Sequence, residues 1–277
     1  MPSPEEFPIL DAFEEHLRIV KGVSERTLDA YLSDLRQLVE RAGDPLALGT
    51  EELLEWLAGF ENKRTLNRKL ASVNAFFDFC HRRGAGNAPA KIPMAKLPQS
   101  LPKYLRPEEI EAGLALIDRS RVSGLRDYAL ILFLYASGCR ISEALSARRE
   151  DLADGWLKIR YAKGAKERMV PLAPRALEAL EAYWRRREWG SSHLWLNNRG
   201  TPLSRVSAWK IVKKYLGVSP HVLRHSYASS LILGGADLRV VQELLGHSSL
   251  LTTQIYTHIE RRHLAETVEA CHPLGRG

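Results

Sequence analysis

The rest of the chain is organised around residues 219–258, SPHVLRHSYASSLILGGADLRVVQELLGHSSLLTTQIYTH. Ser219-Pro220 predicts a helix start, because serine is a favoured capping residue and proline is favoured at the first helical position. Gly234-Gly235 predicts the end of that helix, and Asp237 predicts the start of a second one that Gly246 ends. The sequence therefore predicts two short helices in succession, with apolar residues at helical spacing on their buried sides.

Four side chains of this stretch have the chemistry needed to act on a phosphate. His221 and Arg224 are three residues apart and therefore share one face of the first helix. His247 directly follows Gly246, and Tyr256 lies among polar residues that do not resemble a core. A guanidinium donates paired hydrogen bonds to phosphate oxygens, imidazoles transfer protons near neutral pH, and a phenol can attack phosphorus. We expect the four side chains to converge on a phosphate.

The segments HVLRH, LLGHSS and TTQIYTH, in this order and at these separations, resemble the C-terminal signature of the tyrosine recombinases, the lambda-integrase class. Within that class the chain is most similar to the Xer-type site-specific recombinases. The resemblance covers nearly the whole chain, including TLDAYLSDL in the first helical region. It implies DNA strand exchange through a tyrosine nucleophile, with no metal and no other cofactor.

The resemblance also implies the remaining catalytic residues. GCRISEAL, residues 138–145, is the segment that carries the first catalytic arginine of the family, here Arg140, and Glu143 one turn later is placed to orient it. A purely structural ion pair between Arg140 and Glu143 is the alternative. The family has a catalytic lysine on a hairpin, which the pattern predicts over residues 156–171, and Lys163 fits that position better than Lys166. The implied catalytic set is Arg140, Lys163, His221, Arg224, His247 and Tyr256.

These residues suggest a division of labour. Arg140 and Arg224 would bind the two non-bridging oxygens, and the two histidines would assist them. Lys163 would protonate the departing 5′ oxygen, and Tyr256 would form a 3′-phosphotyrosine link. That link stores the energy of the broken bond, so rejoining needs neither ATP nor a metal ion.

Composition and charge agree with a two-domain protein that binds nucleic acid. The chain has 277 residues, 45% of them hydrophobic, and a formal net charge of +7. Residues 1–85 carry a net charge of −4 and the remainder +11, so the polyanion-binding surface should lie mainly on the second part. The three cysteines are scattered and predict neither a disulfide nor a metal site. With no apolar stretch of membrane-spanning length, a cytoplasmic protein is expected.

The predicted fold is mainly α. Residues 1–85 show four amphipathic helices and resemble the core-binding domain of the recombinases. Residues 86–104 are rich in proline and contain no acidic residue, which predicts a linker. Residues 105–277 predict a mostly helical catalytic domain with a small β-hairpin and a C-terminal tail helix. In the family that helix docks on a neighbouring catalytic domain, and packing against its own chain is the alternative.

Basic residues on the predicted helices, linker and hairpin are candidates for phosphate contact. Solvated helix faces are the alternative interpretation for each of them. The candidates are Arg26, Arg36, Lys63, Arg64, Arg68, Lys69, Lys103, Lys166, Arg205 and Lys210.

The function implied is site-specific recombination of double-stranded DNA within a tetramer, formed with itself or with a sister recombinase. Xer-type proteins resolve chromosome or plasmid dimers, often with a septal DNA translocase of the FtsK type. A mobile-element integrase and a type IB topoisomerase are alternatives with the same chemistry. A non-catalytic helical DNA-binding regulator is an alternative from a different class, although DNA binding alone does not require the six catalytic residues.

Overall fold

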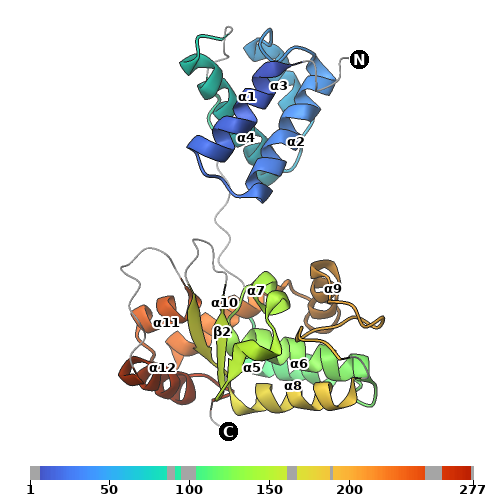
Figure 1. Cartoon of the computed structure of the whole chain (residues 1–277), viewed down its shortest axis with the longest axis vertical. Helices are drawn as coiled ribbons and strands as arrows, with labels where there is room; N and C mark the ends of the chain where they lie inside the picture. Colours follow the sequence, from blue (N-terminus) through green and yellow to red (C-terminus); the bar gives the residue numbers. More distant parts are fainter. Residues whose placement is uncertain are drawn as a thin grey trace. The chain divides into compact units, whose positions relative to one another are not determined.

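The computed structural model describes residues 7–85, 91–94, 104–160, 167–187, 190–246 and 258–275. The chain divides into two compact units, with the boundary between Ser100 and Leu101. Both units are mainly helical, and the second also contains a small antiparallel sheet, which confirms the predicted fold class (Figure 1). Within the ranges given above, no helix is both long enough and apolar enough to cross a membrane.

The N-terminal unit is built from helices whose ends the sequence marks. They are α1 (Pro8–Glu15), which continues into a π-helical turn (His16–Val20), α2 (Glu25–Ala42), α3 (Thr50–Ala58) and α4 (Lys63–Arg82). Ser24 and Asn62 cap α2 and α4 by accepting hydrogen bonds from backbone amides of their first turns. The rings of Phe13 and Phe76 meet edge to face, 5.4 Å apart, in the core between α1 and α4.

Part of the predicted linker belongs to this unit. The side-chain amide of Asn74 on α4 donates to the carbonyl oxygen of Ile92 at 3.0 Å, and its carbonyl oxygen accepts from the Ile92 amide at 3.3 Å. Both backbone groups of Ile92 are thus held by one side chain. Ile92 is therefore held against α4.

The C-terminal unit is organised around one buried helix, α6 (Val122–Ser137). The other helices are α5 (Pro107–Ala115), α7 (Ile141–Ser146), α8 (Pro174–Arg186), α9 (Arg205–Leu216), α10 (Pro220–Leu233), α11 (Leu238–Leu245) and α12 (His258–Cys271), with a 3₁₀ turn at Arg149–Asp151. α6 packs against α8 on one side and α10 on another (Figure 1). Its residues from Ala129 to Ser137 are all buried, so the helix supplies the centre of the core.

The predicted hairpin is part of a three-stranded antiparallel sheet. β1 (Leu152–Ala153) pairs with β2 (Trp156–Ile159), which pairs with β3 (Arg168–Pro171). Asp154 and Gly155 connect β1 to β2 with φ values of 52° and 78°, a left-handed pair that suits a two-residue hairpin turn. Ile159 lies opposite Arg168, so Arg168 is the first residue of β3.

The tail helix α12 packs against α10 and β3 of its own chain. Leu264 and Val268 of α12 are buried, and so are His272 and Leu274 just beyond its end. Gly234, at the end of α10, permits the close approach, because a Cβ atom there would lie 2.2 Å from the carbonyl oxygen of Cys271. The isolated chain thus has the cis arrangement, and exchange of α12 between copies stays a prediction for the assembled complex.

Candidate active site

The turn after α6 places Arg140 at the start of α7. Gly138 ends α6 in a left-handed conformation, with φ of 58°, and a Cβ atom there would lie 2.4 Å from the Tyr227 ring. Arg140 is the N-cap residue of α7, and its backbone amide donates to Oε2 of Glu143 at 2.8 Å. Its Nη1 donates to Oε1 of the same carboxylate, also at 2.8 Å. Glu143 therefore holds both the backbone and the guanidinium of Arg140.

Glu143 is buried and has a second arginine partner that the sequence analysis did not single out. Arg168 of β3 donates from Nη1 and Nη2 to the two carboxylate oxygens, at 3.1 and 2.8 Å. Burial alone would raise the pKa of Glu143, but the hydrogen bonds and charge of Arg168, with those of Arg140, lower it below its usual value. The carboxylate is therefore ionised at neutral pH.

Arg224 lies on α10, whose start at Pro220 and end before Gly234 match the sequence prediction. Ser219 occupies the N-cap position, although its hydroxyl makes no capping hydrogen bond, contrary to expectation. The guanidinium is buried. Its Nη1 donates to the carbonyl oxygen of Gly138 at 2.8 Å, and its Nη2 donates to that of Leu245 at 2.6 Å. Arg224 thus connects the turn that carries Arg140 to the C-terminal end of α11.

The positive charges of this site influence one another. Burial, followed by the neighbouring charges of Arg140 and Arg168, lowers the pKa of Arg224 to about 10, so its guanidinium stays charged at neutral pH. Burial also lowers the pKa of His221, and the charges of Arg205, His225, Arg224 and Arg140 lower it further. An anion bound here would relieve this repulsion, because it would add negative charge among groups that disfavour each other.

The structure brings together Arg140, Glu143 and Arg224 from the predicted set. His221 lies three residues before Arg224 on α10, and the charges of Arg224 and Arg140 lower its pKa. The predicted catalytic residues Lys163, His247 and Tyr256 lie outside the described residues, as do the predicted DNA contacts Lys103 and Lys166. The ends of α11, the helix that precedes His247, match the prediction: Asp237 caps its start, and Gly246 ends it with a φ of 67°. His247 is the next residue in the sequence.

Most of the predicted DNA contacts that the structure describes are on the surface. The exposed ones are Arg26, Arg36, Lys63, Arg64, Arg205 and Lys210, and Arg68 is exposed at 45% of its side chain but paired with Asp34. The prediction for Lys69 is wrong, because its side chain is only 2% exposed. Its ammonium donates to Asp34 at 3.1 Å and to Gln37 at 2.6 Å, and lies over the Trp56 and Phe60 rings. Lys69 is a core residue that neutralises a buried carboxylate.

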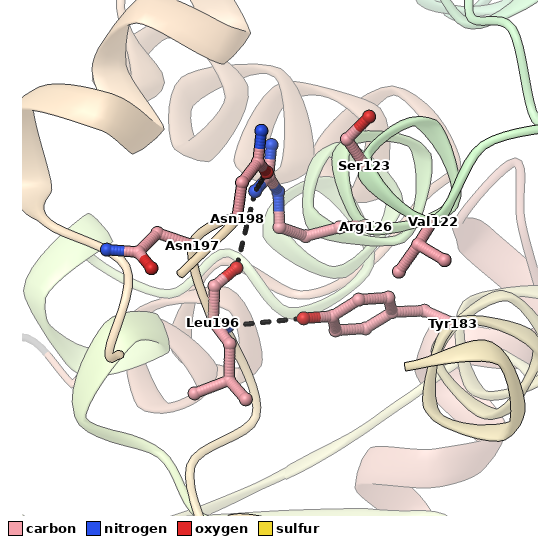
Figure 2. A pocket seen from close by; sticks show the side chains of 7 residues that line it. All are labelled: Val122, Ser123, Arg126, Tyr183, Leu196, Asn197 and Asn198. Atoms are coloured by element: carbon pink, nitrogen blue, oxygen red, sulfur yellow. Dashed lines mark hydrogen bonds between the residues drawn. The ribbon is translucent and has the colours of Figure 1, made fainter. Parts of the chain in front are cut away.

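A surface cavity of about 240 Å³ lies elsewhere in the C-terminal unit (Figure 2). It is lined by Val122, Ser123, Arg126, Tyr183, Leu196, Asn197 and Asn198. Arg126 is turned inward, where its guanidinium donates to Asp127, to the Leu196 carbonyl oxygen and to the Asn198 side chain. The predicted catalytic residues do not line this cavity.

The fold and the described part of the site define a class of protein. A buried arginine and a partly buried arginine are fixed by backbone and carboxylate partners, with a histidine on the same helix as one of them. Such preorganised donors stabilise the charge that develops on a phosphoryl group during its transfer. The described part of the site therefore offers fixed donors of the kind that can bind a phosphoryl group.

The comparisons with known proteins identify the family. Residues 103–263 match the phage integrase family, and residues 10–84 match the phage integrase N-terminal SAM-like domain. The chain is 36% identical over 293 residues to tyrosine recombinase XerC of Thermodesulfovibrio yellowstonii, covering 95% of this chain and 96% of that protein. It is 37% identical over 304 residues to tyrosine recombinase XerD of Bifidobacterium longum, covering 97% and 98%. The chain belongs to the phage integrase family and is a tyrosine site-specific recombinase.

A solved structure shares the fold at low sequence identity. It is a lambda integrase tetramer bound to a Holliday junction, with a TM-score of 0.70 and 19% identity over 90% of this chain and 80% of that one. The mostly helical architecture with a SAM-like N-terminal domain is thus the architecture of the lambda-integrase class.

Proposed function

We propose that this recombinase cuts and rejoins double-stranded DNA with Arg140, Lys163, His221, Arg224, His247 and Tyr256 as its catalytic residues. Arg140 and Arg224 hold the non-bridging oxygens of the scissile phosphate, and His221 and His247 assist them. Tyr256 attacks phosphorus and becomes linked to the 3′ phosphate, while Lys163 gives a proton to the departing 5′ oxygen. The link is broken when the 5′ hydroxyl of another strand attacks it, so the number of phosphodiester bonds is conserved.

The observation that carries this proposal is the hydrogen bond between Arg224 and the carbonyl oxygen of Gly138. Only Cys139 lies between Gly138 and Arg140, so the bond holds α10 against the turn that presents Arg140. Both guanidiniums keep donors that their protein partners do not use, because a guanidinium has five N–H groups. Donors fixed before the substrate arrives cost no reorganisation during the reaction.

The relatives support a proposal about the partners of the enzyme. The lambda integrase structure is a tetramer on a Holliday junction, and the relatives include proteins named XerC and XerD. We infer that four copies of this chain, alone or with a sister recombinase, act on two DNA sites, and that the outcome is resolution of chromosome or plasmid dimers. A septal DNA translocase of the FtsK type is the proposed activating partner, and the cytoplasm is the proposed location.

A nicked suicide substrate tests the chemistry. When the top strand carries a nick beside the cleavage point, the released fragment diffuses away and the protein–DNA adduct accumulates. The wild-type protein should form an adduct that survives a denaturing gel, whereas Tyr256→Phe should bind the same DNA and form none. An adduct that persisted in Tyr256→Phe would overturn the assignment of the nucleophile.

The same substrate separates the enzyme from a DNA-binding regulator. A protein that only binds DNA would shift the substrate in a native gel without forming an adduct under any condition. Candidate sites, tested with and without a second recombinase, would show whether the chain acts alone.

A further inference from the structure

Arg168 is a buried charged residue on a strand, whereas charged residues on surface strands usually point into solvent. It is the first residue of β3, and its side chain is only 3% exposed. Val170, two residues later on the same strand, is also buried, so Arg168 lies on the inward face of the sheet. An arginine is rarely buried without satisfied partners, because the charge loses its hydration.

Within the described part of the chain, the side-chain hydrogen bonds of Arg168 go to Glu143 and to the last turn of α11, beside Arg224. Its Nη1 and Nη2 bind both oxygens of Glu143, whose carboxylate also holds Arg140. Its Nε donates to the carbonyl oxygen of Leu244 at 3.0 Å. The next carbonyl along, that of Leu245, accepts from Arg224. Arg168 therefore touches the supports of both catalytic arginines.

The last turn of α11 is held by two guanidiniums. The final carbonyl groups of a helix have no partner within it and carry a partial negative charge. Arg168 and Arg224 supply donors to two successive carbonyls of this kind, at Leu244 and Leu245. Gly246 then ends the helix, and a Cβ atom there would lie 3.0 Å from Cδ and Nη1 of Arg168. A side chain at this position would press against Arg168, and the φ of 67° independently favours glycine.

A second consequence concerns the rotation of Glu143. A carboxylate bound by a single arginine can turn about its side-chain bonds to follow that arginine. The paired hydrogen bonds from Arg168 fix the plane of the Glu143 carboxylate from the buried side, which leaves Oε1 aimed at Nη1 of Arg140. Arg140 is partly exposed, at 32% of its side chain, so its position depends on this partner more than on surrounding packing.

We propose that Arg168 is a positioning residue of the recombination reaction, which orients Arg140 through Glu143 and fixes the end of α11 beside Arg224. It does not touch the substrate. The proposal rests on the proposed function, because it assumes that Arg140 and Arg224 bind the scissile phosphate.

Two substitutions separate charge from geometry. Arg168→Gln removes the guanidinium, and Arg168→Lys keeps the charge but cannot donate to both carboxylate oxygens and to Leu244 at once. We expect the single-turnover rate of adduct formation to fall about 10²-fold in Arg168→Gln, the loss typical of a small displacement of a catalytic group. Arg168→Lys should recover part of that loss. DNA affinity, measured in the same buffer, should change much less than the rate.

Arg126 provides a matched control for the loss of a buried arginine. It is also buried, and it also binds a carboxylate, Asp127, and a backbone carbonyl, that of Leu196. It lies in the first turns of α6, whereas Arg140 follows the other end, about 18 Å further along the helix axis. Arg126→Gln should lower the melting temperature as Arg168→Gln does, while adduct formation by the folded protein stays near the wild-type rate.

A double-mutant cycle with Glu143→Gln tests the route of the effect. If Arg168 acts through Glu143, the loss of rate in the double variant will be smaller than the product of the two single losses. Multiplicative losses would overturn the route through Glu143. Equal loss of rate in Arg168→Gln and Arg126→Gln at equal folded fraction would leave Arg168 with only a structural role. A wild-type protein that forms no adduct would instead overturn the proposed function, so the two failures are distinguishable.

Discussion

Arg224 and Gly138 are joined by a hydrogen bond of 2.8 Å from Nη1 to the carbonyl oxygen, although 86 residues separate them in the chain. Gly138 makes a second contact with α10, because its Cα faces the ring of Tyr227, which lies one turn after Arg224. The turn that presents Arg140 is therefore fixed on α10 by one polar and one apolar contact. The predictions below test these supports and their neighbours.

Replacing Arg224 should slow DNA cleavage and loosen the site together. Arg224→Lys keeps one charge, but a single ammonium cannot reproduce the planar fork that reaches the carbonyl oxygens of Gly138 and Leu245. We expect the rate of adduct formation to fall by about 10²–10³, as when one oxyanion donor is lost. Single-turnover assays on the suicide substrate measure this. Arg262→Lys, on the exposed side of α12, is the control and should keep the wild-type rate.

Replacing Gly138 should damage the turn without removing a functional side chain. Alanine at Gly138 would have to adopt a φ of 58°, which costs an L-residue about 1–2 kcal/mol, and its methyl group would overlap the Tyr227 ring. The expected result is a lower melting temperature and slower cleavage, with DNA affinity less affected. Gly155→Ala is a useful comparison, since Gly155 also has a positive φ but no atom within 4 Å of the added methyl group. Equal effects on cleavage would contradict the role given to the Tyr227 contact.

His272 should make the C-terminal unit sensitive to acid. Its ring is buried between Tyr135 and Tyr227, and burial lowers its pKa to about 3, so the folded protein holds it neutral. The unfolded chain binds a proton near the usual pKa of about 6.5, so its contribution to stability is present above that pH and is lost as the pH falls toward 3. The free energy of unfolding should decrease by about 1.4 kcal/mol per pH unit from this group alone.

Denaturant unfolding at pH 7.5 and 5.0 measures this dependence. His272→Phe, which cannot be protonated, should show a smaller loss of stability between the two pH values, whatever its stability at pH 7.5. An unchanged loss would show that other groups cause the acid sensitivity.

Lys63 and Lys69, both in the first turns of α4, should behave differently. Lys63 is exposed, so Lys63→Ala should leave the protein stable and, if Lys63 contacts a phosphate, weaken DNA binding with a salt dependence lowered by about 0.9 in log–log slope. Lys69 pairs with the fully buried Asp34, which keeps Arg68 as a second cationic partner, so Lys69→Ala should destabilise the N-terminal unit by about 1–3 kcal/mol. Thermal unfolding and salt titrations of DNA binding distinguish the two. A stable Lys69→Ala protein with weakened DNA binding would restore the original prediction for Lys69.

The pKa of His221 should depend on the charge of Arg205. The charge of Arg205, at the start of α9, contributes to lowering the pKa of His221 on α10. Arg205→Ala should therefore raise that pKa, and Arg199→Ala, an exposed arginine outside this cluster, should not. NMR titration of the His221 ring in the free protein measures the change. A pKa that did not move would place Arg205 too far from the site to influence it.

Local signals in the sequence predicted the helices that carry the described site. Gly138, Gly246 and Asp237 act where the sequence placed them, because a left-handed helix end favours glycine and an N-cap favours aspartate. The pairing of Arg140 with Glu143 was predictable because only one helical turn separates them. Contacts that depend on one turn or one cap are encoded within a few residues.

The misses involve partners that are distant in the chain. Arg168 binds Glu143, 25 residues away, and Lys69 binds Asp34, 35 residues away. Signals for both were present. Arg168 alternates with the buried Val170 along a strand, and Lys69 is four residues before the buried Val73 on a helix, so each shares the inward face. The sequence analysis nevertheless interprets Lys69 as a DNA contact and does not single out Arg168, because the partner of each residue lies far away in the chain.

The burial of His272 and Leu274 sets a limit for protein engineering. The helical part of the chain ends at Cys271, and a shortened protein that stopped there would appear to retain every helix. It would nevertheless lose two core side chains, one of which fills the space between Tyr135 and Tyr227. Purification tags and fluorescent fusions should therefore be attached beyond Gly275, and shortened versions should keep His272 and Leu274.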